Sequence, residues 1–378
     1  MTAGRFQFHK CALPALLVAL GVSGISTAIL LALRFQSPGA DFSCLWAGAV
    51  AARLHPEKLY DFAFVTGLQG WPAGPGALRP FIYPPSALLA FMPFSLLPYW
   101  TGYGLWVAAT GALFLLAGLK ARTPWWFVVL PTVAFVAYCG QVTFLIGGLC
   151  LAALSLRGRP VLAGIAFGLA AAIKPQLLIL VPVALAAEAR WRTLAAAGAT
   201  CATLCAVSVM IWGLQPWFAW LNALIRFQHV IFESPSLMKT AVTPYAVLRS
   251  WRLDGRWAML LAPAALSAVW LAFRRGAALP DRVIVLFGAT LAVSQYAMNY
   301  ELALFAPAVA AYLARTEDRP WLGYVAAALL YTFGPAPVGL VAVLALPAIR
   351  VVAPRLSLSR RMAIPEAAEG GTVKPAEQ

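Results

Sequence analysis

Long apolar runs, separated by short segments that carry arginine pairs, dominate this chain of 378 residues. Hydrophobic residues make up 62% of the chain and charged residues 11%, whereas a soluble domain carries about 25% charged residues. The bilayer core offers no water to backbone amides, so a spanning segment must satisfy its own hydrogen bonds, as a helix does. The weak alternation typical of a transmembrane β-barrel is not seen. The sequence therefore predicts an all-α, polytopic transmembrane bundle.

The apolar runs predict about 11 to 13 transmembrane helices, since each crossing takes roughly 20 apolar residues. The first run, Cys11–Leu33, is longer than the core of a signal peptide, so we expect a retained helix. Segment 84–119 must cross an odd number of times yet reads as two helices; either Pro84–Leu97 is re-entrant or a neighbouring segment is miscounted. The later runs are Trp125–Tyr138, Gln141–Leu156, Val161–Ile173, Gln176–Ala187, Thr193–Gly213, Trp257–Phe273, Arg282–Met298, Leu302–Leu313, Trp321–Phe333 and Val338–Ile349.

Several runs, including Val161–Ile173 and Gln176–Ala187, are too short to cross about 30 Å of hydrocarbon without tilting. Broken or dipping helices are tolerated where they line a cavity, in transporters and lipid-handling enzymes alike. We expect one membrane domain over residues 1–353. It includes a long outer segment at 34–83 with interfacial helices, of which Phe42–Leu54 is one, and an outer loop at 214–256. Residues 354–378 are expected to form a disordered cytoplasmic tail.

The net charge of +15 comes mainly from arginines that lie in the gaps between apolar runs. That placement is the positive-inside pattern of a multi-pass protein of the inner (plasma) membrane, and it argues against nucleic acid as a partner. With the arginine pairs inside, Asp41, Gly140-Gln141, Lys174-Pro175 and Asn299-Tyr300 all fall on the outer face. This convergence predicts a functional site there, in contact with membrane lipids.

Six cysteines lie mostly within apolar runs and show no metal-ligand spacing, so neither a zinc site nor a structural disulfide is predicted. The chain also lacks a P-loop, GxSxG, HExxH or DxD motif. We therefore expect no cofactor and no metal, and a nucleotide-sugar enzyme that relies on a DxD-bound metal is disfavoured.

Asp41 is the carboxylate best placed for chemistry, because it lies where the first helix meets water. A desolvated carboxylate can deprotonate a hydroxyl, although a helix-start residue that favours the helix dipole is the simpler alternative. Lys174, followed by Pro175, either extends to the headgroups or holds an anion. Glu301 is either a functional intramembrane acid or a helix cap. Arg79 is a weaker candidate.

Several motifs occur in an order that resembles glycosyltransferase family 87, of the GT-C superfamily. They are Asp41-Phe42, Leu59-Tyr60-Asp61, Phe81-Ile82-Tyr83-Pro84-Pro85, Gly140-Gln141, Ala163-Gly164, Ala172-Ile173-Lys174-Pro175, Met238-Lys239-Thr240-Ala241-Val242, Leu248-Arg249, and Gln295-Tyr296 through Asn299-Tyr300-Glu301. Three positions depart from the family pattern. Glu301 replaces a late aspartate, Gln295 stands where a proline is usual, and Ala241 stands where a serine is usual.

The resemblance implies inverting, metal-independent transfer of a sugar, usually mannose, from a polyprenyl-phosphate donor to a lipid or glycan acceptor on the outer face. In this hypothesis Asp41 is the general base. Lys174, Arg249 and Lys239 bind the donor phosphate. Tyr83, Gln141, Tyr300, Glu301 and Asp61 line the sugar and acceptor pocket. Two alternatives stay open: a transporter or flippase for a lipid-linked glycan, whose broken helices would form a substrate path, and a structural membrane subunit.

Overall fold

The structure is a computed structural model that describes residue 21 and residues 37–70, 78–233 and 241–313. These residues form helices joined by short connections, with a single isolated β-bridge between Ala241 and Met298. This confirms the predicted all-helical membrane bundle. The runs Cys11–Leu33, Trp321–Phe333 and Val338–Ile349, the tail at 354–378 and Lys239 lie outside the described residues, so the expected number of crossings stays a prediction.

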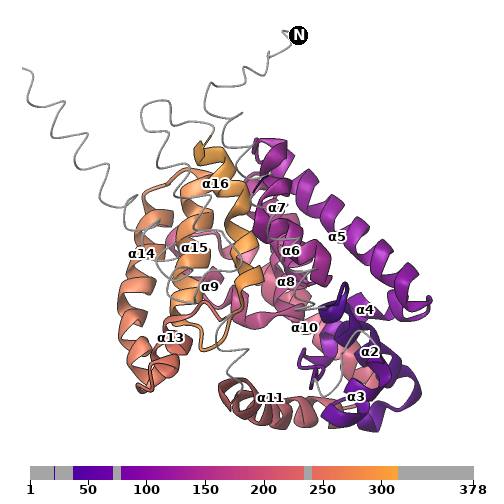
Figure 1. Cartoon of the computed structure of the whole chain (residues 1–378). Coiled ribbons are helices and arrows are strands. Elements are labelled where there is room, and N and C mark those ends of the chain that lie inside the picture. Colours follow the sequence, from indigo (N-terminus) through magenta and orange to yellow (C-terminus); the bar gives the residue numbers. More distant parts are fainter. Residues whose placement is uncertain (1–20, 22–36, 71–77, 234–240, 314–378) are drawn as a thin grey trace, which may run out of the picture.

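The helices follow the predicted apolar runs closely from residue 99 to residue 212 (Figure 1). In chain order the elements are α2 (Ala40–Leu54), η1 (Pro56–Lys58), α3 (Phe62–Gln69), η3 (Pro85–Ala87), α4 (Leu88–Ser95), α5 (Tyr99–Lys120), η4 (Trp125–Val129), α6 (Pro131–Cys139), α7 (Thr143–Ser155), α8 (Pro160–Ile173), η5 (Pro175–Leu178), α9 (Val181–Ala187), α10 (Trp191–Trp212), α11 (Gln215–Glu233), α13 (Pro244–Ser250), η6 (Gly255–Leu261), α14 (Ala262–Arg274), α15 (Leu279–Val293), η7 (Asn299–Phe305) and α16 (Ala306–Leu313).

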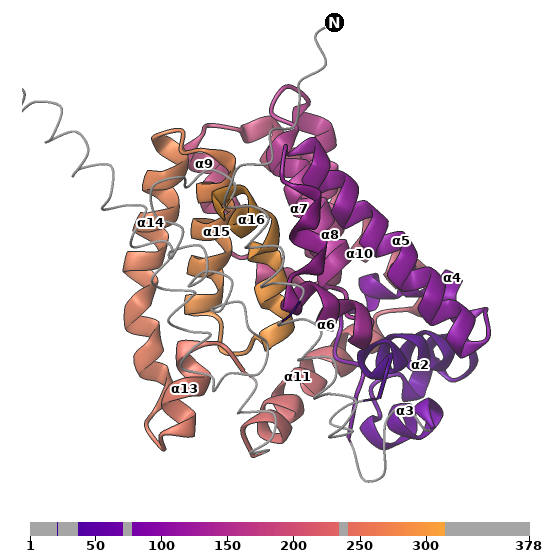
Figure 2. The ribbon, with the colours of Figure 1, turned by 45° about the horizontal axis from the view of Figure 1, so that its top comes forward.

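Three of the described helical stretches are long and apolar enough to cross a membrane: Tyr99–Lys120, Trp191–Trp212 and Gly255–Arg274. Shorter apolar helices pack among them, as the short runs in the sequence predicted. Helices α14, α15, α16 and α7 lie in this order across the bundle, and α5 runs along its far side (Figures 1 and 2).

The bundle has two ends with different connections. At one end, which we call the arginine end, the turns between α5 and η4, α7 and α8, α9 and α10, and α14 and α15 contain Arg122, Arg157, Arg159, Arg190 and Arg275. At the other, the Asp41 end, lie α2, α3, the turn between α6 and α7, and the connection from α15 to η7 (Figure 1). The sequence pattern predicted this separation.

Helix α2 differs from the amphipathic interfacial helix expected at Phe42–Leu54. Ten of its fifteen residues are buried, because small residues on several sides allow close neighbours. A Cβ on Gly48 would lie 2.3 Å from the Phe81 ring. Helix α2 is therefore packed within the Asp41 end, against α3 and α4, rather than lying with one apolar face in lipid.

Segment 84–119 contains one long helix rather than two. Residues Pro85–Ser95 form only a short apolar helix, made of η3 and α4, and α5 is the candidate span. Figure 1 shows α4 beside α2, near the start of α5. Of the two readings left open by the sequence, the structure matches the one in which Pro84–Leu97 does not cross by itself.

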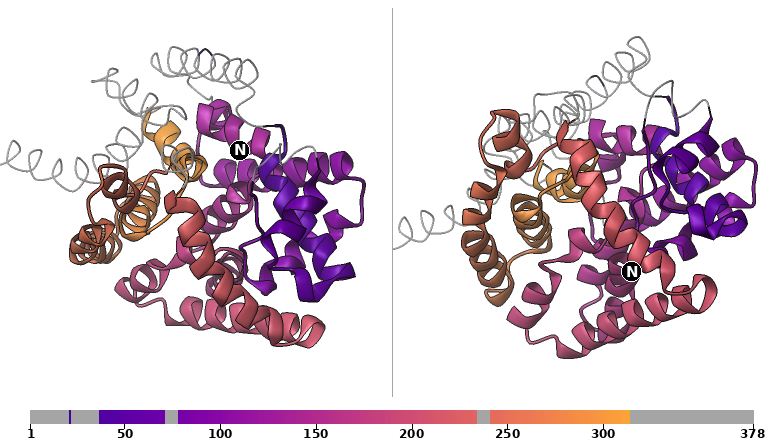
Figure 3. Two further views of the ribbon diagram at one scale, coloured as in Figure 1. Left: turned by 60° about the horizontal axis from the view of Figure 1, so that its bottom comes forward. Right: turned by 90° about the horizontal axis from the view of Figure 1, so that it is seen from below.

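The segment expected as an outer loop at 214–256 is largely helical where the structure describes it, and its place on the outer face stays a prediction. Helix α11 spans nineteen residues and runs across the Asp41 end, transverse to α14 and α15 (Figures 1 and 3). Its Trp220 indole donates to the Ile82 carbonyl, and Arg226 donates to the Tyr60 carbonyl. Phe218, Leu221 and Ile225 are exposed along one stripe. The three- and four-residue spacing of these apolar residues was the missed helical signal.

Helices α8 and α10 pack closely against each other, and the contact depends on glycine. A Cβ on Gly164 would lie 2.5 Å from the Thr193 carbonyl oxygen, and one on Gly168 would lie 2.6 Å from the Ala197 carbonyl oxygen. Gly164 and Gly168 are four residues apart, and small residues at this spacing let membrane helices approach closely. Since α8 ends at Ile173, this contact helps to place Lys174, the residue that follows the helix.

We expect Gly168→Ala to destabilise the protein, because the added methyl group meets backbone that cannot move away. Overpacking of this kind costs about 1–3 kcal/mol. Gly198→Ala, on α10, is the matched control, since a Cβ there meets nothing within 4 Å and alanine is the better helix former. The measurement is thermal unfolding of both variants in detergent. Equal melting temperatures would contradict the packing described here.

Candidate active site

Two glycines with left-handed backbone bring Asp41 and Gln141 together. Gly39, with φ 71°, precedes α2, and its N–H donates to the Tyr138 carbonyl over 2.8 Å. Gly140, also with φ 71°, ends α6, and a Cβ there would lie 2.7 Å from the Cβ of Phe42. Other residues are strained in this backbone conformation. The start of α2 and the turn after α6 are thus in direct contact. Asp41 is the second residue of α2, and Gln141 directly follows Gly140.

Arg79 pairs with Asp41 across 38 positions of sequence. Its Nη1 lies 3.5 Å from Asp41 Oδ1, and the two side chains remain 24% and 18% exposed. The backbone of Arg79 is fixed by α3, because its N–H donates to Thr66 Oγ1 and its carbonyl accepts from the Gln69 amide. The ion pair is therefore held in place. Both side chains are partly exposed, while Asp41 Oδ2 and Arg79 Nε are buried.

Tyr83 and Gln141 form the wall beside this pair. The Tyr83 hydroxyl donates to Gln141 Oε1 over 3.1 Å, and the same oxygen accepts from the Val142 N–H over 2.7 Å. Because Oε1 accepts twice, the amide nitrogen of Gln141 is left as a donor, and Gln141 lowers the pKa of the neighbouring Asp41 carboxyl.

Lys174 is buried, and its partner is Glu301. Its Nζ forms an ion pair with Glu301 Oε1, while Glu301 Oε2 accepts from the N–H of Met298. Lys174 Nζ also lies 5.5 Å from the centre of the Tyr300 ring. Glu301 thus caps η7, as one of the two alternatives predicted, and it also neutralises a buried cation. Lys174 does bind an anion, as one alternative predicted, but that anion is the Glu301 carboxylate.

The segment before η7 is tied to the chain that enters α13. The Val242 N–H donates to the Ala297 carbonyl over 2.9 Å, and Thr243 Oγ1 hydrogen-bonds to the Gln295 carbonyl over 3.1 Å. The described end of the motif at 238–242, residues Ala241 and Val242, therefore lies against the motif at 295–301. Together they position Tyr300 and Glu301.

The surroundings of Asp41 act on its proton affinity in opposite directions. Burial raises the pKa of the Asp41 carboxyl above its usual range, while Arg79, Lys174 and the hydrogen bond from Gln141 oppose that rise. Glu301 adds a small further increase in the pKa. Desolvation dominates, so Asp41 binds a proton more readily than an exposed aspartate does. That is the behaviour required of a general base.

Not every predicted site residue joins this cluster. The structure brings together Asp41, Tyr83, Gln141, Lys174, Tyr300 and Glu301. Asp61 is exposed and caps α3 by accepting from the Phe64 N–H. Arg249 is exposed in the last turn of α13, where its charge acts on Asp254. Sequence reasoning placed too little weight on Arg79, whose nearness to Asp41 depends on the fold of α3.

Residues 81–297, more than half of the chain, match glycosyltransferase family 87. The protein belongs to this family. No curated protein and no solved structure matches it. The resemblance drawn from the motifs is therefore confirmed, and the protein is a membrane glycosyltransferase. The matched region contains Tyr83, Gln141 and Lys174, whereas Asp41 and Glu301 lie on either side of it.

We expect Glu301→Gln to destabilise this glycosyltransferase strongly, because Lys174 would remain buried without a counter-charge. Breaking a buried ion pair on one side costs about 3–5 kcal/mol. The double variant Lys174→Met with Glu301→Gln removes both charges and should recover much of that loss. The measurement is a double-mutant cycle on unfolding in detergent.

The control for this cycle is Asp254→Asn, which breaks the exposed pair between Asp254 and Arg256. Solvent screens an exposed pair, so this change should have little effect on stability. Losses that simply add in the double variant would show that Lys174 and Glu301 are not energetically coupled.

Proposed function

We propose that the protein transfers a sugar, mannose, from a polyprenyl-phosphate donor to a hydroxyl of a lipid or glycan acceptor, with Asp41 as the general base. The reaction inverts the anomeric centre, because the acceptor oxygen attacks as the lipid phosphate departs from the opposite side. The proton of the acceptor hydroxyl goes to Asp41, and the lipid phosphate leaves with the bonding electron pair.

The observation that carries this proposal is the state of the Asp41 carboxylate. Its Oδ1 faces Arg79, while its Oδ2 has no hydrogen-bond partner among the described residues. The side chain is partly exposed, and burial raises its pKa. A carboxylate with one oxygen anchored and the other free can accept a proton from a hydroxyl that approaches it.

Arg79 is the residue we assign to the donor phosphate. Its guanidinium is adjacent to the base, partly exposed, and its Nε lacks a hydrogen-bond partner within the described part of the chain. A guanidinium can bind a phosphate through two parallel N–H groups and stabilise the charge that develops as the phosphate leaves. Lys174, already paired with Glu301, would contribute to this field through space.

Tyr83, Gln141 and Tyr300 are the proposed contacts of the sugar and the acceptor. Each lies close enough to the acid cluster for its hydroxyl or amide to interact with Asp41, directly or electrostatically. Glu301 supports Tyr300 rather than the sugar in this scheme, because both of its carboxylate oxygens are engaged by Lys174 and the Met298 N–H.

The site is proposed to work on the outer face of the inner (plasma) membrane. Four turns at the opposite end of the bundle carry arginines, and cytoplasmic loops are the ones enriched in such residues. A lipid-linked donor suits a site at the end of a membrane bundle, since its chain can remain in the bilayer. A flippase would also need a path for lipid, but membership of a glycosyltransferase family favours transfer.

We expect Asp41→Asn to lower the rate of transfer by about 10²- to 10⁴-fold, the usual contribution of a general base. The assay follows radiolabelled polyprenyl-phosphate-mannose and candidate lipid acceptors with the purified protein. Glu57→Gln is the control, because Glu57 is an exposed carboxylate of the same outer segment. Near-normal turnover of Asp41→Asn would remove the base assignment.

The pH profile tests the pairing of Arg79 with Asp41. Arg79 lowers the pKa of Asp41, so Arg79→Gln should raise that pKa further. Because the ionised carboxylate is the active form, the acidic limb of the rate profile should move to higher pH. Arg79→Lys keeps the positive charge and should leave the limb nearer its original position. A limb that does not move in Arg79→Gln would mean that another group titrates.

A further inference from the structure

A second concentration of charge lies at the arginine end, far from Asp41 along the helices. A cavity of about 350 Å³ there is lined by the ends of α5, α7 and α15, and its charged lining residues are Lys120, Arg122, Arg157 and Arg282. None of the lining residues is acidic. The proposed transfer reaction uses none of these residues.

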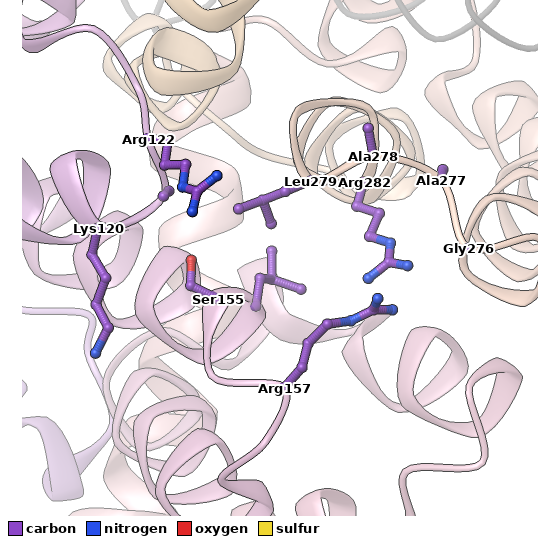
Figure 4. A pocket seen from close by; sticks show the side chains of 11 residues that line it. Lys120, Arg122, Ser155, Arg157, Gly276, Ala277, Ala278, Leu279 and Arg282 are labelled. Atoms are coloured by element: carbon purple, nitrogen blue, oxygen red, sulfur yellow. The ribbon is translucent and has the colours of Figure 1, made fainter. Parts of the chain in front are cut away.

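Arg157 and Arg282 approach each other from different elements. Figure 4 shows their guanidinium groups facing each other, while Arg122, from the end of α5, lines the opposite side of the cavity beyond Leu279. Lys120 points away from them (Figure 4). Like charges held this close repel, so the arrangement favours an anion between them.

Glu188 supplies a carboxylate to this group of arginines. Glu188 forms ion pairs with Arg157, with Arg282 over 3.0 Å, and with Arg190 over 3.7 Å. One negative charge shared among three guanidinium groups leaves a positive excess, and Arg122 and Lys120 add to it. The positive excess at this end favours the binding of a further anion.

Arg282 also has hydrogen-bonding capacity left over. It is buried, at 2% exposure, and its Nε and Nη2 have no hydrogen-bond partner in the described structure, although Nη2 lies near Glu188. Unpaired buried donors on a charged group are costly. They are expected where a ligand completes the pairing.

The backbone at the same place favours an anion. Ala277, Ala278 and Leu279 line the cavity and form the start of α15, a helix of fifteen residues. The N-terminus of a helix presents free N–H groups and the positive end of the helix dipole. Side-chain charge, unpaired donors and the helix dipole therefore act in the same direction.

We propose that this cavity binds a phosphate group, either of an anionic phospholipid headgroup or of a soluble phosphate ester. Guanidinium groups match phosphate oxygens in pairs, which favours phosphate over a simple halide. Two candidate spans end here, at Lys120 and Arg274, which places the cavity at the level of headgroups. The bound phosphate neutralises Arg122, Arg157 and Arg282 and joins α5, α7 and α15.

The test compares two variants that lose the same charge at the same end of the full-length protein. Arg122→Gln with Arg157→Gln removes two lining arginines. Arg159→Gln with Arg192→Gln removes two exposed arginines that do not line the cavity. Thermal stabilisation is titrated with phosphatidylglycerol, with phosphatidylcholine and with glycerol phosphate, each added to delipidated protein in detergent.

We expect phosphatidylglycerol to stabilise the wild type and the control, and to bind the lining variant about tenfold or more weakly, as the loss of two basic contacts with a headgroup requires. Stabilisation by glycerol phosphate and not by the lipid would assign the cavity to a soluble ester. Equal weakening in both variants, or stabilisation by phosphatidylcholine alone, would overturn the proposal. So would a wild type that responds to none of the three.

Discussion

The ion pair between Lys174 and Glu301 is the interaction on which the Asp41 end depends. Both groups are buried, so each would be expensive to bury alone, and only their mutual contact makes the arrangement tolerable. The pair joins the junction of α8 and η5 to η7, across 127 positions of sequence. It thereby brings Tyr300 and the chain before η7 against the region that contains Asp41, and sets part of the field that Asp41 experiences.

The charged groups around that pair differ in how far they are paired, and the difference follows their exposure to water. Buried charges are matched one to one at the Asp41 end, whereas the pair of Asp41 and Arg79 keeps partial access to water. At the arginine end the cations outnumber the described carboxylates that contact them. A single helical bundle thus combines a neutralised ion pair, one end that carries the proposed base and a basic opposite end, each set by a few side chains at the ends of helices.

The sequence predicted what depends on local pattern. Apolar runs gave the bundle and most helix positions from 99 to 212, and arginine spacing separated its two ends. Five motif residues proposed to act with Asp41, namely Tyr83, Gln141, Lys174, Tyr300 and Glu301, do lie in its vicinity. The predictions that failed concern residues whose positions depend on tertiary contacts, or whose side chains are already used by their own helix. Arg79 reaches Asp41 only because Thr66 and Gln69 fix its backbone, and Asp61 is taken up by the start of α3. Helix α2 carries enough small residues to be covered on several sides.

Helix α8 has only fourteen residues, a length of about 21 Å, which is shorter than the roughly 30 Å of hydrocarbon in a typical bilayer. Its exposed Val161, Leu162 and Ile165 lie toward its first turns. Lipid tails beside it must shorten or tilt to follow it, an example of hydrophobic mismatch. Because Lys174 follows the last residue of α8, the thickness of the surrounding membrane should act on the junction beside Asp41, the proposed base.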